Sequence, residues 1–267
     1  MSYRDNSLWL AEFPGDLEPR PALTGPTSVD VAIVGGGFTG LWTAYYLTER
    51  NPELRIAIVE REICGFGASG RNGGWAIGEL ACGVDGYADH AGHDEAMRLV
   101  RMAMASVEEI ERVTRTENID CRFEKGGTVY LARSDAQEIR QRELIEHERA
   151  HGFTEDEIRL LTADEATAMV NATDVRCGVW YAATAALDPA RLVRALADVV
   201  ESRGVQIFER TAVTAIEPGR LVIDSGDVSA PVVVRATEGY TRDLAGERRT
   251  IVPLYSLMIA TEPLEDA

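Results

Sequence analysis

Lysine is almost absent from this chain of 267 residues: Lys125 is the only lysine among 27 basic residues. The other basic residues are arginines, so the abundance of arginine reflects a compositional bias and does not by itself indicate a binding patch. Acidic residues number 44, which gives a net charge of −17. This charge disfavours binding to nucleic acid or to an anionic membrane surface, because both would be repelled.

Long apolar runs are also absent. No run approaches 18 apolar residues, which excludes a transmembrane helix of the ordinary kind. The first five residues are polar and no apolar segment follows them directly, so a secretory signal is not expected. We therefore expect no membrane span and a cytoplasmic location.

Cysteine and histidine are scarce, with four residues of each. The cysteines lie far apart and form no C-x-x-C pair, which favours free thiols over disulfides or metal ligands. The histidine pairs 90/93 and 147/151 have helix-compatible spacing. The second pair lies in a strongly charged segment, however, and neither pair adjoins a cysteine cluster. The pattern favours solvated surface histidines, and no metal site is predicted.

Glycine, in contrast, is concentrated in two short runs. The first follows the apolar segment 31–34 and contains Gly35, Gly37 and Gly40 in the spacing G-x-G-x-x-G, with a helical pattern directly after Gly37. Gly35 permits a tight turn, Gly37 lets the backbone approach a pyrophosphate, and Gly40 lets helix and strand pack closely. The helix N-terminus then directs unpaired N–H groups and the positive end of its dipole toward the anion.

Glu60 follows the second apolar segment, 56–59, and lies 25 residues after Gly35. A carboxylate at this position accepts hydrogen bonds from ribose hydroxyls and repels a 2′-phosphate. The strand, glycine turn, helix and acidic residue together predict a dinucleotide site. The alternative is an ordinary βαβ unit that has a glycine-rich turn and no ligand.

The second glycine run covers residues 65–74 and contains five glycines and few bulky side chains. The main chain of such a segment can follow an extended ligand closely and donate N–H groups to it. A nicotinamide dehydrogenase has no clear need for this run, whereas a flavin has a ribityl chain and a large ring system to be held. The run therefore favours FAD as the dinucleotide.

The segments V-D-V-A-I-V-G-G-G-F-T-G-L, V-E-R and G-A-S-G-R-N-G-G together resemble the D-amino acid oxidase family of FAD-dependent oxidoreductases. Within this family, the chain is most similar to the glycine oxidase, sarcosine oxidase and gamma-glutamylputrescine oxidase branches. The resemblance extends to residues 188–189, 211–213 and 234–240. Many flavoproteins share the first glycine turn, but its combination with S-G-R-N-G-G is much more specific.

The resemblance implies where parts of FAD would lie. Ala68 and Ser69 match the family's section near the pyrophosphate, and residues 73–75 match the stretch beside the flavin ring. A valine at the position of Val213 contacts the adenine end through its backbone, and the segment 236–240 lies near the cofactor. From the glycine pattern and the resemblance together, the predicted cofactor-binding residues are Gly35, Gly37, Phe38, Thr39, Gly40, Glu60, Arg61, Gly67, Ala68, Ser69, Arg71, Asn72, Gly73, Gly74, Trp75, Val213, Ala236, Thr237 and Gly239.

The predicted fold class is α/β: a Rossmann-like FAD-binding domain (βαβ, mostly parallel sheet) with an inserted mixed α+β substrate domain. Residues 1–28 are rich in proline and are predicted to form an N-terminal arm. Residues 29–84 and 184–248 are assigned to a discontinuous FAD-binding domain. Residues 85–183 and 249–267 are assigned to an incomplete substrate domain.

Several elements have clear local signals. Apolar residues recur three and four apart from 92 to 116, which predicts an amphipathic helix. Capping-box spacing at Ser134 and Thr162, and Asp188 followed by proline, predict three further helix starts. The apolar runs predicted to rejoin the cofactor sheet are 205–208, 212–216, 221–223 and 232–236, and a strand pair of the second domain is predicted over 251–261.

Members of the family continue well past the length of this chain, through further strands of the substrate domain and a final glycine-rich segment over the flavin. The resemblance therefore implies that the chain corresponds to an N-terminal portion of such an enzyme or to a shortened homologue. Edge strands and apolar surface that the remaining part would cover are then expected to be exposed.

The activity implied by the resemblance is oxidation of the C–N bond of an amino acid or other amine, by hydride transfer to flavin N5 and hydrolysis of the resulting imine. The expected partners are a small amine or amino acid substrate and oxygen or another electron acceptor. No catalytic residue is assigned, because members of the family do not all depend on a side-chain base. Two alternatives stay open: a truncated fragment that is inactive or binds FAD weakly, and an NAD(P)-dependent dehydrogenase.

Overall fold

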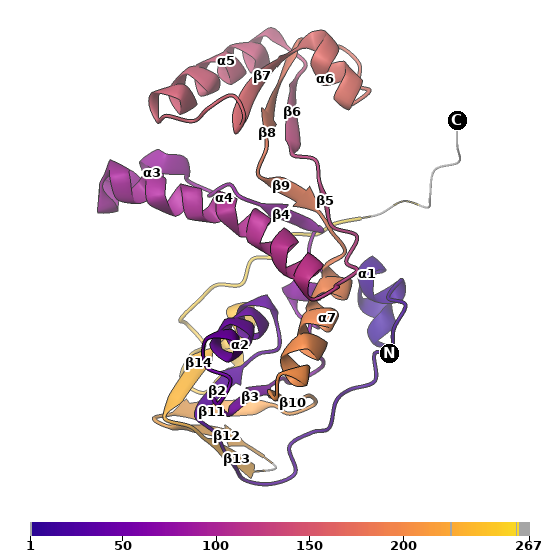
Figure 1. Cartoon of the computed structure of the whole chain (residues 1–267), viewed down its shortest axis with the longest axis vertical. Coiled ribbons are helices and arrows are strands. Elements are labelled where there is room, and N and C mark those ends of the chain that lie inside the picture. The colour runs from indigo at the N-terminus through magenta and orange to yellow at the C-terminus, as the bar shows by residue number, and fades with distance from the viewer. Residues whose placement is uncertain (1, 225, 260, 262–267) are drawn as a thin grey trace. The chain divides into compact units, whose positions relative to one another are not determined.

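The structure is a computed structural model, which describes residues 2–224, 226–259 and 261. The chain forms two compact units (Figure 1). Unit 1 comprises residues 1–74, 119–121 and 188–267, and unit 2 comprises residues 75–118 and 122–187. Each unit has its own sheets, helices and buried core.

Unit 1 contains a four-stranded sheet with the order β10-β3-β2-β14, in which every neighbouring pair is parallel. All residues of the central strands β2 and β3 are buried, as expected for parallel strands covered on both faces. Helix α2 connects these two strands, which confirms the predicted βαβ unit. The bounds are β2 Val31–Val34, α2 Phe38–Arg50, β3 Ile56–Val59, β10 Gln206–Phe208 and β14 Val232–Arg235.

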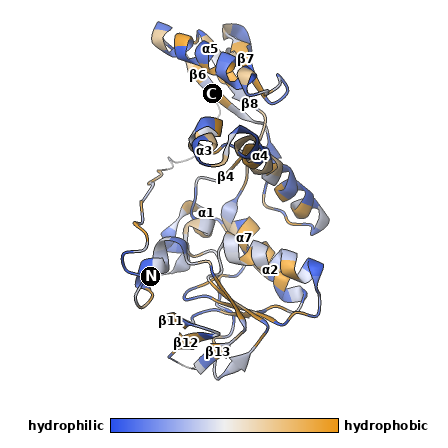
Figure 2. Ribbon diagram, turned by 90° about the vertical axis from the view of Figure 1, so that its left-hand side faces the viewer, coloured by the Kyte–Doolittle hydropathy of each residue, from blue (hydrophilic) through white to orange (hydrophobic). Residues whose placement is uncertain are grey.

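The parallel sheet lies between two further layers (Figure 1). Helix α2 packs against α7, Pro189–Ser202, on one face. On the other face, Val34 and Val59 pack with Leu221 and Val228 of a second sheet, so that one buried core joins the two sheets. Figure 2 shows how the hydrophobic residues gather along these strands. The second sheet has the order β1-β13-β12-β11, with bounds β1 Thr27–Ser28, β11 Val213–Glu217, β12 Arg220–Ile223 and β13 Gly226–Ser229.

The predicted return of the chain to the cofactor sheet is correct for two of the four apolar runs. Runs 205–208 and 232–236 form β10 and β14 of the parallel sheet, whereas 212–216 and 221–223 form β11 and β12, which pair antiparallel in the second sheet. The reason is the short connection between β11 and β12, where Gly219 has φ +72°. A two-residue hairpin permits only antiparallel pairing, because parallel neighbours need a long crossover.

Unit 2 contains two antiparallel three-stranded sheets. The first has the order β4-β9-β5, with β4 Trp75–Ile77, β5 Glu124–Lys125 and β9 Thr184–Ala186. The second has the order β6-β8-β7, with β6 Thr128–Ala132, β7 Ile158–Thr162 and β8 Cys177–Tyr181. The predicted mixed α+β character of this region is therefore correct.

Four helices accompany these sheets in unit 2: α3 Gly83–Ala91, α4 His93–Thr116, α5 Asp135–Ala150 and α6 Ala163–Met169. Helix α4 confirms the predicted amphipathic helix, and its residues Ala96 and Val100 are buried with Phe153 and Val179 in one core. Both predicted caps form, because the side chains of Ser134 and Thr162 accept N–H groups of the first turns of α5 and α6.

The compact units divide the chain after residues 74 and 187, whereas the sequence analysis placed the boundaries after 84 and 183. Strand β9 pairs with β4 and also with β5, so the strands at 75–77 and 184–186 share a sheet with residues of the predicted substrate domain. The segment 249–259 belongs to unit 1. No strand forms in its described residues, so the strand pair predicted there is wrong; residues 260 and 262–267 lie outside the described residues.

The N-terminal arm is partly ordered against unit 1. It contains the short helices η1, Tyr3–Asn6, and α1, Leu8–Ala11. Leu10 and Leu17 are buried in a cluster with Ile63 and Ala190, so these apolar residues hold the arm on the unit. Among the described residues, every helix is too short or too polar to cross a bilayer.

Candidate functional site

A cavity of about 160 Å³ lies in unit 1, where the parallel strands end. Val34, Val59 and Ala236 line it, and these residues end β2, end β3 and follow β14. The carboxyl ends of parallel strands are where ligands bind in open α/β sheets. The location therefore agrees with the dinucleotide site predicted from the sequence.

The first glycine turn forms one wall, and the structure explains each of its three glycines. Gly35 has φ +108°, and a Cβ there would lie 2.4 Å from the carbonyl oxygen of Ala236. A Cβ on Gly37 would lie 2.8 Å from Ser69 Oγ, and one on Gly40 would lie 2.1 Å from the Gly35 carbonyl oxygen. Any side chain at these positions would force the turn, the strand end and the second glycine run apart.

Helix α2 begins at this wall. Its N-cap residue is Gly37, whose position provides no side-chain cap. The N–H of Phe38 instead donates to Ser69 Oγ at 2.9 Å, and both Phe38 and Thr39 line the cavity. The first-turn N–H groups of a helix have no acceptor within it, and with the helix dipole they attract an anion. The cavity thus has the features of a phosphate site.

Glu60 lies beside the same turn and lines the cavity. Its carboxylate accepts the N–H of Gly36 at 2.8 Å and the N–H of Glu62 at 2.9 Å. Burial raises the pKa of Glu60 above its ordinary value, and these two backbone hydrogen bonds offset part of the effect. Each carboxylate oxygen has a second lone pair, which can accept a hydrogen bond from a ligand hydroxyl.

The second glycine run reaches the same cavity, as the sequence analysis required. Gly65, Gly67, Ala68 and Ser69 line it, and the Gly65 N–H donates to the Gly36 carbonyl oxygen at 3.0 Å. Gly65 has φ +87°, and a Cβ there would lie 2.3 Å from Val193 Cγ1 of α7. The run is therefore fixed between the first glycine turn and α7, and a ligand could contact both glycine runs at once.

The remaining wall comes from residues distant in sequence. Arg61, Val213 and Thr237, three of the predicted cofactor-binding residues, line the cavity. The Arg61 guanidinium forms an ion pair with Asp243, 3.0 Å from Nη1 to Oδ2, and its Cζ lies 4.8 Å from the ring centre of Tyr240. Lining residues that the prediction did not include are Val34, Val59, Gly65, Phe66, Thr211, Glu238, Tyr240, Asp243 and Leu244. Gly65 and Phe66 lie in the second glycine run, and Thr211, Glu238 and Tyr240 lie in segments that carry the family resemblance, but none of them was itself predicted to bind the cofactor.

Seven predicted cofactor residues do not line this cavity: Gly40, Arg71, Asn72, Gly73, Gly74, Trp75 and Gly239. Arg71 donates to the Tyr240 hydroxyl at 3.0 Å. The Asn72 side chain donates to the Ala68 carbonyl oxygen at 3.2 Å and accepts the Gly74 N–H at 2.8 Å, so it fixes the glycine run. Trp75 starts β4 in unit 2. The predicted position of residues 73–75 beside the flavin ring stays a prediction, as does the cofactor contact of the other four.

Unit 2 has a cavity of its own, also of about 160 Å³. Its titratable lining residues, within the described part of the chain, are three glutamates and a tyrosine: Glu79, Glu148, Glu157 and Tyr181. Glu157 is paired with Arg101, and Glu79 accepts the Tyr130 hydroxyl at 3.3 Å. Burial raises the pKa of both Glu79 and Glu148. A cationic group in this cavity would favour their ionised forms.

Comparison with known proteins identifies related chains. The family model described as FAD dependent oxidoreductase matches residues 30–267. The probable oxidoreductase OrdL of Haemophilus influenzae is 31% identical, over 92% of this chain and 58% of its own length. Gamma-glutamylputrescine oxidoreductase of Escherichia coli is 28% identical, over 97% of this chain and 61% of its own length.

Solved structures show the same fold. Glycine oxidase from Geobacillus kaustophilus superposes with a TM-score of 0.67 at 24% identity, over 83% of this chain and 58% of that chain. The chain thus spans about three fifths of the length of the relatives that it matches.

Proposed function

The chain belongs to the family of FAD-dependent oxidoreductases, and from that premise we propose that it forms the FAD-binding part of an enzyme that oxidises the C–N bond of an amine or amino acid. The family's cofactor is FAD, which agrees with the cofactor predicted from the two glycine runs. The observation that carries the proposal is a cavity of unit 1 in which the first glycine turn, the α2 N-terminus, Glu60 and the segment 65–69 meet.

We assign parts of FAD to this cavity by their chemistry. The pyrophosphate would lie at Gly37 and the first turn of α2, because Gly37 presents bare backbone there and the N-terminus of a helix attracts an anion. The adenosine ribose would donate its hydroxyls to Glu60. Val213, on the far wall, would face the adenine. The segment 65–74 would then lead toward the flavin ring.

FAD held in this cavity would supply the redox chemistry, as the acceptor of the hydride that C–N bond oxidation releases. The chain's own residues bind and orient. Ser69 accepts the Phe38 N–H and so holds the second glycine run against the helix that faces the phosphates. Asn72 fixes the bend at residues 72–74. No side chain is assigned the role of a base.

An amine substrate is supported by the acidic cavity of unit 2, the region predicted to hold the substrate domain. Glu79 and Glu148 are partly buried there, and burial raises the pKa of both. A substrate ammonium group would compensate two desolvated carboxylates, whereas an anionic substrate would be repelled. The name of gamma-glutamylputrescine oxidoreductase also refers to an amine. The particular amine and the electron acceptor are not assigned.

The test begins with the purified chain of 267 residues. We expect a yellow protein that releases FAD on denaturation, and anaerobic addition of amines should bleach the visible flavin absorbance. A colourless protein whose fluorescence responds to NADH and not to FAD would overturn the proposal in favour of a nicotinamide-dependent dehydrogenase. Bound FAD that no amine or amino acid reduces would retain the cofactor assignment and reject the substrate class for this chain.

A further inference from the structure

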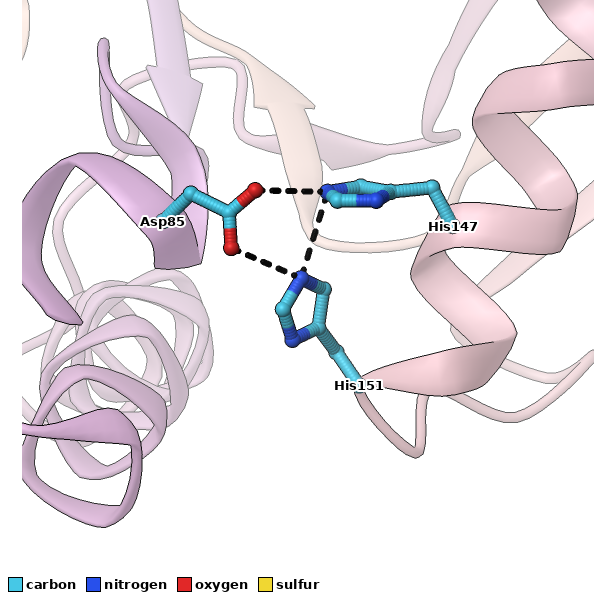
Figure 3. Close-up of side chains that lie close together, drawn as sticks. All are labelled: Asp85, His147 and His151. Carbon is cyan, nitrogen blue, oxygen red and sulfur yellow. Dashed lines mark hydrogen bonds and ion pairs between the residues drawn. The ribbon is translucent and has the colours of Figure 1, made fainter.

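Two histidines and an aspartate of unit 2 meet in a cluster whose members line neither of the two cavities described above (Figure 3). His147 lies in the last turn of α5, and His151 is its C-cap. Asp85 lies in the first turn of α3. Residues four apart share one face of a helix, so both imidazoles project toward the carboxylate of Asp85.

The three groups approach one another through potential ligand atoms. His147 Nε2 lies 3.1 Å from Asp85 Oδ2, and His151 Nε2 lies 3.3 Å from Asp85 Oδ1. The two Nε2 atoms are 3.2 Å apart. Each imidazole nitrogen therefore has two close neighbours, one carboxylate oxygen and one other imidazole nitrogen.

We propose that Asp85, His147 and His151 bind a divalent transition-metal ion, with Zn²⁺ as the best match. A metal ion lets both Nε2 atoms and one oxygen of Asp85 present lone pairs to one centre. Tetrahedral Zn²⁺ with bonds of about 2.0–2.1 Å places its ligand atoms about 3.3 Å apart. The separation of the two Nε2 atoms, 3.2 Å, agrees with that spacing, and each Nε2 lies 3.1 or 3.3 Å from one of the two oxygens of Asp85. Two imidazoles and one carboxylate are a ligand set that Zn²⁺ uses in proteins.

His93 completes the arrangement as a positioning residue. Its Nε2 lies 3.0 Å from His151 Nδ1, and its Nδ1 lies 3.7 Å from Asp94 Oδ1. When His151 binds metal through Nε2, its Nδ1 carries the hydrogen and can donate to His93. A partner on the second ring nitrogen fixes the tautomer and the orientation of a metal-binding histidine.

The local field also favours a cation. The site lies at the C-terminal end of α5, where the helix dipole places partial negative charge. The Asp85 and His147 side chains are 66% and 50% exposed, so an ion can reach them from solvent, while His151 is 11% exposed and held in place. Bound metal would join α3 to α5 within unit 2 and stabilise their packing.

The test is calorimetric titration of the full 267-residue chain with Zn²⁺ after removal of metal with a chelator. We expect one ion per chain and a rise in the melting temperature on its addition. Asp85→Asn and His147→Ala should each lower the affinity at least tenfold and abolish the thermal shift. His93→Ala should lower the affinity roughly 10- to 100-fold, the usual effect of removing a partner of a ligand.

His90→Ala is the matched control, because it removes a histidine of α3 that is outside the cluster, and it should leave the affinity unchanged. Asp85→Asn keeps the size of the side chain, so it remains informative if His147→Ala does not fold. Stoichiometric Zn²⁺ binding that persists in both Asp85→Asn and His147→Ala would overturn the proposal. So would the absence of Zn²⁺ binding by the unsubstituted chain.

Discussion

Gly37 has no space for a side chain, because a Cβ there would lie 2.8 Å from Ser69 Oγ. We predict that Gly37→Ala displaces Ser69, breaks its contact with the Phe38 N–H and weakens FAD binding about tenfold, or about 1.4 kcal/mol. The control is Gly25→Ala, where an added Cβ meets no atom within 4 Å. Flavin fluorescence titration measures both. Equal affinities of the two variants for FAD would contradict the proposed phosphate position.

Glu60 gives the site a pH dependence. Burial raises its pKa, so the carboxyl group gains a proton at a higher pH in the folded than in the unfolded chain. Without ligand, the folded chain therefore binds more protons than the unfolded chain at pH values between the ordinary pKa of glutamate and the raised pKa of Glu60. The contribution of Glu60 to the free energy of unfolding falls as the pH rises through this range. FAD binding should have the opposite sign under the proposed assignment, in which ribose hydroxyls donate to the ionised carboxylate of Glu60.

We predict that the affinity for FAD rises with pH as Glu60 loses its proton, and that Glu60→Gln weakens binding about tenfold at neutral pH and removes this component of the pH dependence. Fluorescence titrations between about pH 5 and pH 8 compare the two proteins. If Glu60→Gln kept the original affinity and pH profile, the ribose assignment would be wrong.

At the scale of secondary-structure elements, a fully buried glutamate connects three parts of unit 1. Glu209 follows β10, and its Oε1 accepts from Arg194 of α7 at 2.9 Å and from Arg20 of the arm at 3.3 Å. It also accepts the backbone N–H of Cys64 at 2.7 Å, next to the second glycine run. Burial raises the pKa of the Cys64 thiol, which therefore stays neutral beside these charges.

We predict that Glu209→Ala lowers the free energy of unfolding by about 3–5 kcal/mol, because it leaves two largely buried guanidinium groups without their shared carboxylate. Glu201→Gln is the control. Its side chain also pairs with Arg20 but is 46% exposed, so solvent can replace the contact and the loss should be about 1 kcal/mol or less. Urea unfolding measures both, and similar losses in the two variants would argue against a structural role for the buried cluster.

At the scale of the whole chain, the segment 252–259 exposes much apolar surface. Val252, Leu254, Leu257 and Ile259 are between 81% and 96% exposed. An apolar run of this kind promotes association of chains. We predict that Leu254→Asp with Leu257→Asp lowers the binding of a hydrophobic dye and the fraction of aggregated protein, with no loss of FAD binding. Unchanged dye binding and aggregation in light scattering would contradict this.

The features that the sequence predicted well are those set by local interactions. Asp188 caps α7 by accepting the Arg191 N–H, as its position before Pro189 predicted. Strands β2 and β3 were predicted from short buried apolar runs bounded by glycine or charge. The strand pair over 251–261 was predicted on the same apolar pattern. It is wrong for the described residues 251–259, because a strand also needs a pairing partner, which the pattern does not contain.

By itself, the sequence determined the main features of the dinucleotide site in unit 1. These are three glycines at fixed spacing, an acidic residue after the next strand and a second glycine run. These are local constraints of backbone conformation and charge, so neighbouring residues suffice to express them. Only the tertiary structure decided that Tyr240 and Asp243 join the cavity, and that Asp85 meets His147 and His151. Such contacts join residues far apart in sequence, and packing, which no local pattern encodes, brings them within reach of one another.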